Sequence, residues 1–328
     1  MRHDDRIRIA ERRLFSSHAR RLDVQEAYLD LPRADVHLRV LSIGAGPDIV
    51  MLHGVSLSTA AWVPLLPELT GYRLHLVDLP GHGLSSPINY KRSTVRRHTI
   101  QLIDDLLNAL RLESAPVIGH SLGGMFALWY ASERPERISS LVVIGDPAVA
   151  LPGVTVRMPL SVMGLPILGP LMLRAPTPQP LYRYLLGQGL SPAAAAAAPD
   201  ALLDVLRLQS RRRENAHTTA SLLHALNHLR RPREGSVMSD AELSRVTVPT
   251  MFAWGADDPF LSPMQARRSI AKLPSAILHE LPGGHGPWFE DPTVCATVII
   301  QHLTNTGHPP ALDNPTAASG GSAADSFG

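Results

Sequence analysis

The segment Gly119-His120-Ser121-Leu122-Gly123-Gly124 stands between two apolar runs. The run before it, 115–118, is short enough for a buried strand, and the run after it, 125–130, favours a helix. This order predicts a strand, a sharp turn and a helix. In a G-x-S-x-G turn the serine lies at a strained backbone position that lifts its hydroxyl clear of the sheet, and the small residues let neighbouring backbone pass closely. Ser121 is therefore the candidate nucleophile.

A serine hydroxyl is a poor nucleophile near neutral pH. It requires a base, an acid that orients this base, and donors for the oxyanion that forms. The helix after Ser121 begins at the turn, so its first free N–H groups and its positive dipole end point to the place where an oxyanion would form. The rest of the chain has to supply the base and the acid.

Short apolar segments alternate with helical ones along much of the chain. Polar and apolar residues alternate over 22–31 and 35–43, which is typical of antiparallel edge strands. More uniformly apolar strands are predicted at 48–52, 72–78, 115–118, 137–144, 248–254 and 276–281, and helices at 93–112, 125–133, 263–273 and 293–303. Strands and helices that alternate at such short intervals predict an α/β fold with a parallel sheet covered on both faces.

The alternation stops between residues 148 and 245. No buried strand is predicted there, but helices are predicted to start at Ser191-Pro192 and Pro199-Asp200, which indicates an inserted helical lid. The predicted organisation is a basic N-terminal segment (1–21) with a short helix over 6–20, two parts of an α/β core (22–147 and 246–303) separated by the lid (148–245), and a disordered tail rich in Gly, Ser, Ala and Pro (304–328).

The composition indicates an ordinary globular chain. Hydrophobic residues make up 45% of the 328 residues and charged residues 18%, and the formal net charge is +2, so no nucleic-acid partner is expected. The uncharged stretch 158–173 is too short and too rich in Pro and Gly to span a membrane, and no stable membrane insertion is expected. The N-terminus lacks the apolar core of a signal peptide, and the single cysteine, Cys295, excludes an internal disulfide, so a cytoplasmic location is predicted.

Candidates for the base and the acid follow the last two predicted strands. Asp257 and Asp258 come after strand 248–254, and His285 comes after the next one. The carboxyl ends of parallel strands meet at one edge of a sheet, which is also where Ser121 lies. A histidine at this edge can take the serine proton, and a carboxylate can hold the imidazole tautomer and stabilise its charged form.

These motifs, in this order, resemble those of the α/β-hydrolase superfamily, in particular its lid-bearing esterases, lipases, carbon–carbon bond hydrolases and cofactor-free perhydrolases. The resemblance covers about residues 22–303 and rests on His53-Gly54, Asp78-x-x-Gly-x-Gly-x-Ser85, the turn at 119–124, Trp254-Gly255-x-x-Asp258 and Gly284-His285. It implies a mostly parallel eight-stranded sheet of the α/β-hydrolase type. The implied site residues are Ser121 as nucleophile, His285 as base, Asp258 as acid, and the backbone N–H groups of Val55 and Leu122 as the oxyanion hole.

Other acids and two other motifs compete with this assignment. Asp257 is a neighbour that would cap a helix or face solvent, and Asp146, at the end of an earlier strand, is an alternative acid. The histidines 217, 224 and 228 lie on nearly one face of a predicted helix, but no cysteine or obvious carboxylate completes a set, so no metal is expected. The Gly-x-Gly of 78–85 lacks the third glycine of a dinucleotide fingerprint, and no cofactor is expected.

The resemblance implies a serine hydrolase that transfers an acyl group from an ester, thioester or lactone. The predicted partner is a small substrate with an apolar acyl part, because the lid carries more apolar side chains than a thin lid can bury. Met163 and Leu168 in the lid are predicted to contact this substrate, as is Trp288 beside the candidate base. His53 is expected near the substrate too, where it would orient the oxyanion loop by hydrogen bonding.

Three alternative functions use the same fold. A carbon–carbon bond hydrolase of vinylogous diketones shares the triad and lid, but that group usually has Asn and Met where this chain has His120 and Leu122. Cofactor-free perhydrolase or haloperoxidase-type chemistry would use Ser121 as well. A non-enzymatic ligand-binding protein is disfavoured, because such proteins generally lose a triad member and this chain keeps candidates for all three.

Overall fold

The computed structural model describes residues 2–18, 23–91 and 94–311. One sheet of eight strands has the order β1-β2-β4-β3-β5-β6-β9-β10. Its strands are β1 (Val24–Leu31), β2 (Val36–Ile43), β3 (Asp48–Leu52), β4 (Arg73–Val77), β5 (Ala115–His120), β6 (Ile138–Ile144), β9 (Thr250–Gly255) and β10 (Ala276–Leu281). β2 pairs antiparallel with β1 and β4, and the remaining neighbours are parallel. The predicted mostly parallel eight-stranded sheet is confirmed.

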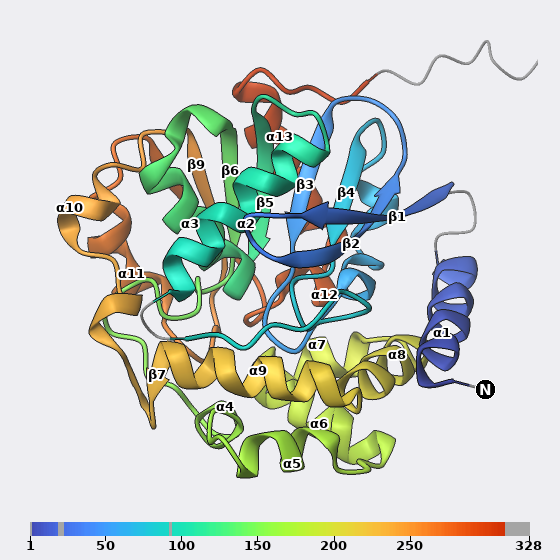
Figure 1. The fold of residues 1–328 in the computed structure, drawn as a ribbon. Coiled ribbons are helices and arrows are strands. Elements are labelled where there is room, and N and C mark those ends of the chain that lie inside the picture. Colours follow the sequence, from blue (N-terminus) through green and yellow to red (C-terminus); the bar gives the residue numbers. More distant parts are fainter. Residues whose placement is uncertain (1, 19–22, 92–93, 312–328) are drawn as a thin grey trace, which may run out of the picture.

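Helices cover both faces of this sheet and enclose two apolar cores (Figure 1). Val117 of β5 packs into one core and Ile118 into the other, because successive side chains of a strand point to opposite faces. The first core receives α2 (Val95–Ala109), α3 (Leu122–Glu133) and α11 (Pro263–Ile270), and the second receives α12 (Pro287–Glu290) and α13 (Pro292–Asn305). The shorter elements are η1 (Thr59–Trp62), η2 (Leu66–Glu68), η3 (Pro135–Arg137), η4 (Glu234–Ser236) and α10 (Asp240–Leu243).

The segment predicted to form a lid holds a cluster of helices that lies below the sheet in Figure 1. These helices are α4 (Leu160–Met163), α5 (Leu168–Arg174), α6 (Gln179–Gly189), α7 (Pro192–Ala197), α8 (Asp200–Ser210) and α9 (Arg213–Leu226). α7 begins where its sequence predicts, because the Ser191 hydroxyl accepts a hydrogen bond from the N–H of Ala194. A short antiparallel pair, β7 (Asn227–His228) and β8 (Arg231–Pro232), follows α9. The sequence does not predict these strands, because two residues are too few to show an alternation of polar and apolar side chains.

The N-terminal helix α1 (His3–His18) lies against α8 and is tied to the sheet by a buried ion pair (Figure 1). The Arg39 guanidinium on β2 donates to both carboxylate oxygens of Glu11, at 3.0 and 2.8 Å, and to Asp78 at 2.9 Å. Gln209 at the end of α8 also donates to Glu11, at 3.0 Å. One carboxylate of α1 thus joins the first helix, the sheet and the lid.

The C-terminal residues contradict part of the predicted disorder. α13 ends at Asn305, and the following chain packs back on the loop before β4, where Ala311 N–H donates to Gly71 O at 2.8 Å and the Tyr72 hydroxyl donates to His308 O at 3.0 Å. Residues 304–311 are therefore ordered, because backbone hydrogen bonds hold a segment whose composition alone suggests a tail. Residues 312–328 lie outside the described residues. Searching the described helices reveals none with the length and apolarity needed to cross a bilayer.

Candidate active site

Ser121 occupies the sharp turn between β5 and α3. Its backbone has φ 51° and ψ −110°, a conformation that non-glycine residues rarely adopt. A Cβ at Gly119 would lie 2.6 Å from the backbone of Gly123, and one at Gly123 would lie 2.1 Å from the carbonyl oxygen of Leu52. Only glycine fits at these two positions, so the turn that holds Ser121 depends on the small residues around it.

His285 and Asp258 form a buried pair next to this turn. His285 Nδ1 lies 2.7 Å from Asp258 Oδ2, and both side chains are buried. The carboxylate is fixed from two further sides, since Asp146 N–H donates to Oδ2 at 2.9 Å and Phe260 N–H donates to Oδ1 at 3.0 Å. When Nδ1 donates to the carboxylate, Nε2 of His285 is left as the nitrogen that can accept a proton. The neighbouring Asp257 is exposed, and its N–H donates to the carbonyl of Gly283.

Asp146 contributes its backbone to this pair, and its side chain lies in a separate environment. Its residue is 1% exposed, and neither carboxylate oxygen has a hydrogen-bond partner among the described residues. Burial, together with the negative charge of Asp258, raises the pKa of Asp146 well above its usual range. Asp146 is one of the residues that line a small cavity of about 50 Å³, together with Ser121 and Leu122. Asp258, and not Asp146, is the acid that contacts His285.

The two expected oxyanion donors lie beside Ser121. Leu122 is the first residue of α3, so no preceding helical turn accepts its N–H. Val55 lines the small cavity together with Ser121 and Leu122. His53 Nε2 accepts from Leu79 N–H at 3.0 Å, which places its proton on Nδ1, and Nδ1 donates to Gly54 O at 2.8 Å. His53 thus holds the loop that leads to Val55.

His53, Leu168 and Trp288 are not among the residues that line the two cavities at Ser121, so the structure does not bring these three predicted residues to the cavity walls. His53 and Trp288 are both 0% exposed. Trp288 stacks on Trp62 and its indole N–H donates to the carbonyl of Ala61 at 3.0 Å, so it belongs to the core. Leu168 is 51% exposed, because α5 buries Gly169 and Pro170 in its place.

The larger cavity at Ser121 has a volume of about 220 Å³ and a mainly apolar lining. Ser121 and His285 both line it, together with Val55. Met163 is there as predicted, and its neighbours in the wall are Met158, Leu160, Met172, Leu173, Leu185, Leu186 and Phe260. The lid helices therefore supply most of the apolar surface that faces the serine.

His120 and Phe260 are site residues that sequence reasoning did not single out. His120 Nε2 donates to the backbone carbonyl of His285 at 3.1 Å, and its ring lies between His285 and Trp288. Burial lowers the pKa of His120 well below its usual range, so the ring is neutral. Phe260 places its ring in edge contact with His285, with centroids 4.7 Å apart. The sequence could have pointed to them, because His120 directly precedes Ser121 and Phe260 lies two residues after Asp258.

Comparison with known proteins identifies the family of the chain. Residues 49–298 match the model of the alpha/beta hydrolase family. The chain is 29% identical to a pimeloyl-(acyl-carrier protein) methyl ester esterase of Chromobacterium violaceum, over 82% of this chain and 98% of that protein. It is also 29% identical to a 2-hydroxy-6-oxononadienedioate/2-hydroxy-6-oxononatrienedioate hydrolase of Cupriavidus pinatubonensis, over 80% and 89%.

The fold is similar to that of a solved bacterial esterase. The crystal structure of carboxylesterase CesB from Bacillus subtilis superposes with a TM-score of 0.72 at 17% identity, over 92% of this chain and 99% of that one. The family model covers well over half of the chain, and relatives of both kinds are hydrolases. The chain therefore belongs to the alpha/beta hydrolase family, and it is an enzyme of that family.

Proposed function

We propose that the protein is a serine esterase that works by acyl transfer, with Ser121 as nucleophile, His285 as base and Asp258 as the acid that orients it. The observation that carries this proposal is the 2.7 Å contact of Asp258 with His285, which lines the same cavity as the strained Ser121. A nucleophile, a base and an orienting carboxylate at one strand edge form the arrangement that activates a serine.

The proposed reaction has two steps. Ser121 Oγ attacks the ester carbonyl while His285 Nε2 takes its proton, and the N–H groups of Val55 and Leu122 stabilise the oxyanion. The tetrahedral intermediate collapses, and the leaving alcohol takes the proton from His285. Water then attacks the acyl-enzyme with His285 again as base, and Ser121 recovers its proton as the carboxylic acid leaves. The sum is ester plus water giving acid plus alcohol.

The substrate we propose is a small ester, thioester or lactone with an apolar acyl part. The cavity of about 220 Å³ is lined by methionines and leucines of the lid, which favour an alkyl chain. Methionine side chains adapt to several shapes, so a range of acyl groups is expected. A cytoplasmic location stays a prediction, which cell fractionation would test.

Carbon–carbon bond hydrolysis is the second candidate, since one of the similar relatives carries that activity. Side-by-side assays with p-nitrophenyl esters and a vinylogous diketone decide between the two. Ester turnover at least tenfold above diketone turnover supports the proposal, and the reverse ratio contradicts it.

The Ser121→Ala variant tests the nucleophile directly. We expect it to lose ester turnover and labelling by a fluorophosphonate while its circular dichroism spectrum stays that of the wild type, because the change removes one hydroxyl from a turn whose shape depends on Gly119 and Gly123. Labelling of Ser121→Ala at the wild-type rate would show that another residue is the nucleophile.

A further inference from the structure

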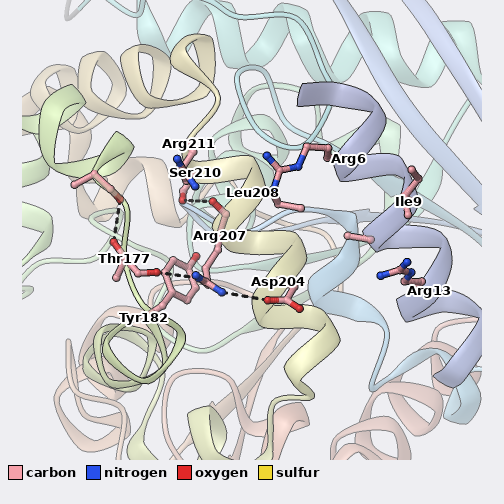
Figure 2. Close-up of a pocket in the computed structure, with 12 residues that line it drawn as sticks. Arg6, Ile9, Arg13, Thr177, Tyr182, Asp204, Arg207, Leu208, Ser210 and Arg211 are labelled. Atoms are coloured by element: carbon pink, nitrogen blue, oxygen red, sulfur yellow. Dashed lines mark hydrogen bonds and ion pairs between the residues drawn. The ribbon is translucent and has the colours of Figure 1, made fainter. Parts of the chain in front are cut away.

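A further cavity, of about 430 Å³, lies between α1 and α8 and is rich in arginine. Arg6 and Arg13 enter it from α1, and Arg207 and Arg211 from the end of α8 and the residue after it (Figure 2). Asp204 is the one carboxylate in its lining. We call this cavity the arginine pocket. Its charge is strongly positive, in a protein whose formal net charge is only +2.

Most of this positive charge has no partner. Arg207 donates to Thr177 O at 3.0 Å and to Asp204 at 3.2 Å, as Figure 2 shows. Within the described part of the chain, the guanidinium groups of Arg6, Arg13 and Arg211 make no hydrogen bond or ion pair. Guanidinium groups gathered around one cavity repel each other, and they match the paired oxygens of a carboxylate or phosphate. The pocket is therefore suited to an oxyanion.

The helix that carries Arg6 and Arg13 is held in place by contacts with the lid and the sheet. Arg6 and Arg13 are seven residues apart, which puts them on one face of the helix. α1 is fixed to the lid by an ion pair between Arg212 and Asp4 at 2.9 Å, and by the buried Glu11 at its centre. These contacts fix the backbone of α1 in advance, so an anion that binds there has to order only the exposed arginine side chains.

The arginine pocket adjoins the cavity that contains Ser121. Thr177, Tyr182 and Ser210 line both cavities. An acyl chain that extended from Ser121 along the apolar wall to these three residues would point toward the arginines on their other side.

We propose that the arginine pocket binds an oxyanion, a carboxylate or a phosphate, at the far end of the acyl chain whose carbonyl Ser121 attacks. This inference rests on the proposed esterase function and narrows its substrate class to esters with a distal negative charge. In this proposal the apolar cavity binds the acyl chain, and the arginine pocket selects substrates by the length of that chain and by the negative charge at its far end.

Matched substrates test this proposal. We compare p-nitrophenyl esters of six to twelve carbons that end in a methyl group, a carboxylate or a phosphonate, using wild type, Arg6→Ala/Arg211→Ala and Arg12→Ala. Arg12 is exposed on α1 and does not line the pocket, so it is the control. We expect the ratio of kcat/KM for the charged over the methyl-ended ester to fall about tenfold in the double variant, as for two partly exposed ion pairs, and to stay at the wild-type value in Arg12→Ala.

The two charged series identify the anion, because the series whose ratio falls further in the double variant contains the ligand chemistry. Equal losses on charged and methyl-ended esters, or an unchanged ratio, would overturn the proposal. Calorimetric titration of Ser121→Ala with octyl phosphate and with octanedioate separates this result from the catalytic assignment. Binding that the double arginine change abolishes supports the pocket even if Ser121 proves not to be the nucleophile, and absence of binding of both ligands contradicts it.

Discussion

At the scale of single residues, the two buried aspartates near His285 have different environments and different expected roles. Asp258 accepts hydrogen bonds from His285 and from two backbone N–H groups, whereas the carboxylate oxygens of Asp146 have no partner among the described residues. Position at a strand end does not separate them, since both follow parallel strands. The hydrogen-bond partners do, because Asp258 contacts His285 and Asp146 does not, and we therefore expect only Asp258 to take part in the reaction.

Exchange of Asp258 for Asn tests the first of these roles. We expect Asp258→Asn to lose about 10,000-fold in kcat, because the amide would favour the wrong tautomer of His285. Asp146→Asn keeps the backbone N–H that supports Asp258, and we expect it to lose far less. Steady-state kinetics on one ester measure both, and a larger loss in Asp146→Asn would move the acid to β6.

Asp146 also predicts a pH dependence of stability. Its pKa is raised above the ordinary value of 3.8, so folding favours its protonated form. The stability linked to this proton is fully present below pH 3.8 and is lost as the pH rises through the raised pKa. Asparagine carries no such proton, and we expect Asp146→Asn to gain unfolding free energy relative to wild type as the pH rises above about 4. Urea unfolding at several pH values measures this difference, and a constant difference would contradict it.

At the scale of elements, we expect the lid helices to decide which acyl chain fits, because they supply most of the apolar lining at Ser121. Met163 in α4 lines the cavity at Ser121, whereas Leu168 at the start of α5 faces outward, only five residues later. The apolar stretch predicts a lid surface. The angle between the short helices α4 and α5 decides which of its side chains face the serine. The sequence does not fix such angles, because they depend on packing against α9.

These two residues form a matched pair for testing the acyl pocket. Met163→Ser removes a buried apolar side chain worth about 1.5–3 kcal/mol, so we expect kcat/KM for an octanoate ester to fall about tenfold or more while an acetate ester changes little. Leu168→Ser is the control and should leave both esters near wild type. Equal losses on octanoate and acetate in Met163→Ser would mean that the methionine only holds the lid together.

At the scale of the whole molecule, the sequence predicts where the strands lie along the chain and which residues follow them. It does not predict the side-chain contacts between distant segments. Ser121, Asp258 and His285 follow strands with clear apolar patterns, so the parallel sheet brings them to one edge. Glu11 and Arg39 look like ordinary surface charges in the sequence, and only the fold buries them together. Trp288 fits a core position and a pocket position equally well by composition, and packing on Trp62 decides between them.

The buried link at Glu11 predicts a large effect on stability. Glu11→Ala would leave Arg39 with fewer partners in a dry site, and we expect it to lower the free energy of unfolding by about 3 kcal/mol. Asp240→Ala, which breaks the exposed ion pair with Lys272, is the comparison and should cost less than about 1 kcal/mol. Urea denaturation measures both, and similar small effects would show that α1 is not anchored through Glu11.

The loop that carries His285 is bonded to the lid itself, since the His285 N–H donates to the carbonyl of Leu190 at 2.8 Å. A Cβ on the preceding Gly284 would lie 2.4 Å from that same carbonyl, so the two backbones meet without any side chain between them. Displacement of the segment around Leu190 would remove this hydrogen bond from the loop of His285. We therefore expect the chain at Leu190 to stay in place when a substrate enters, so that access to Ser121 depends on other parts of the lid.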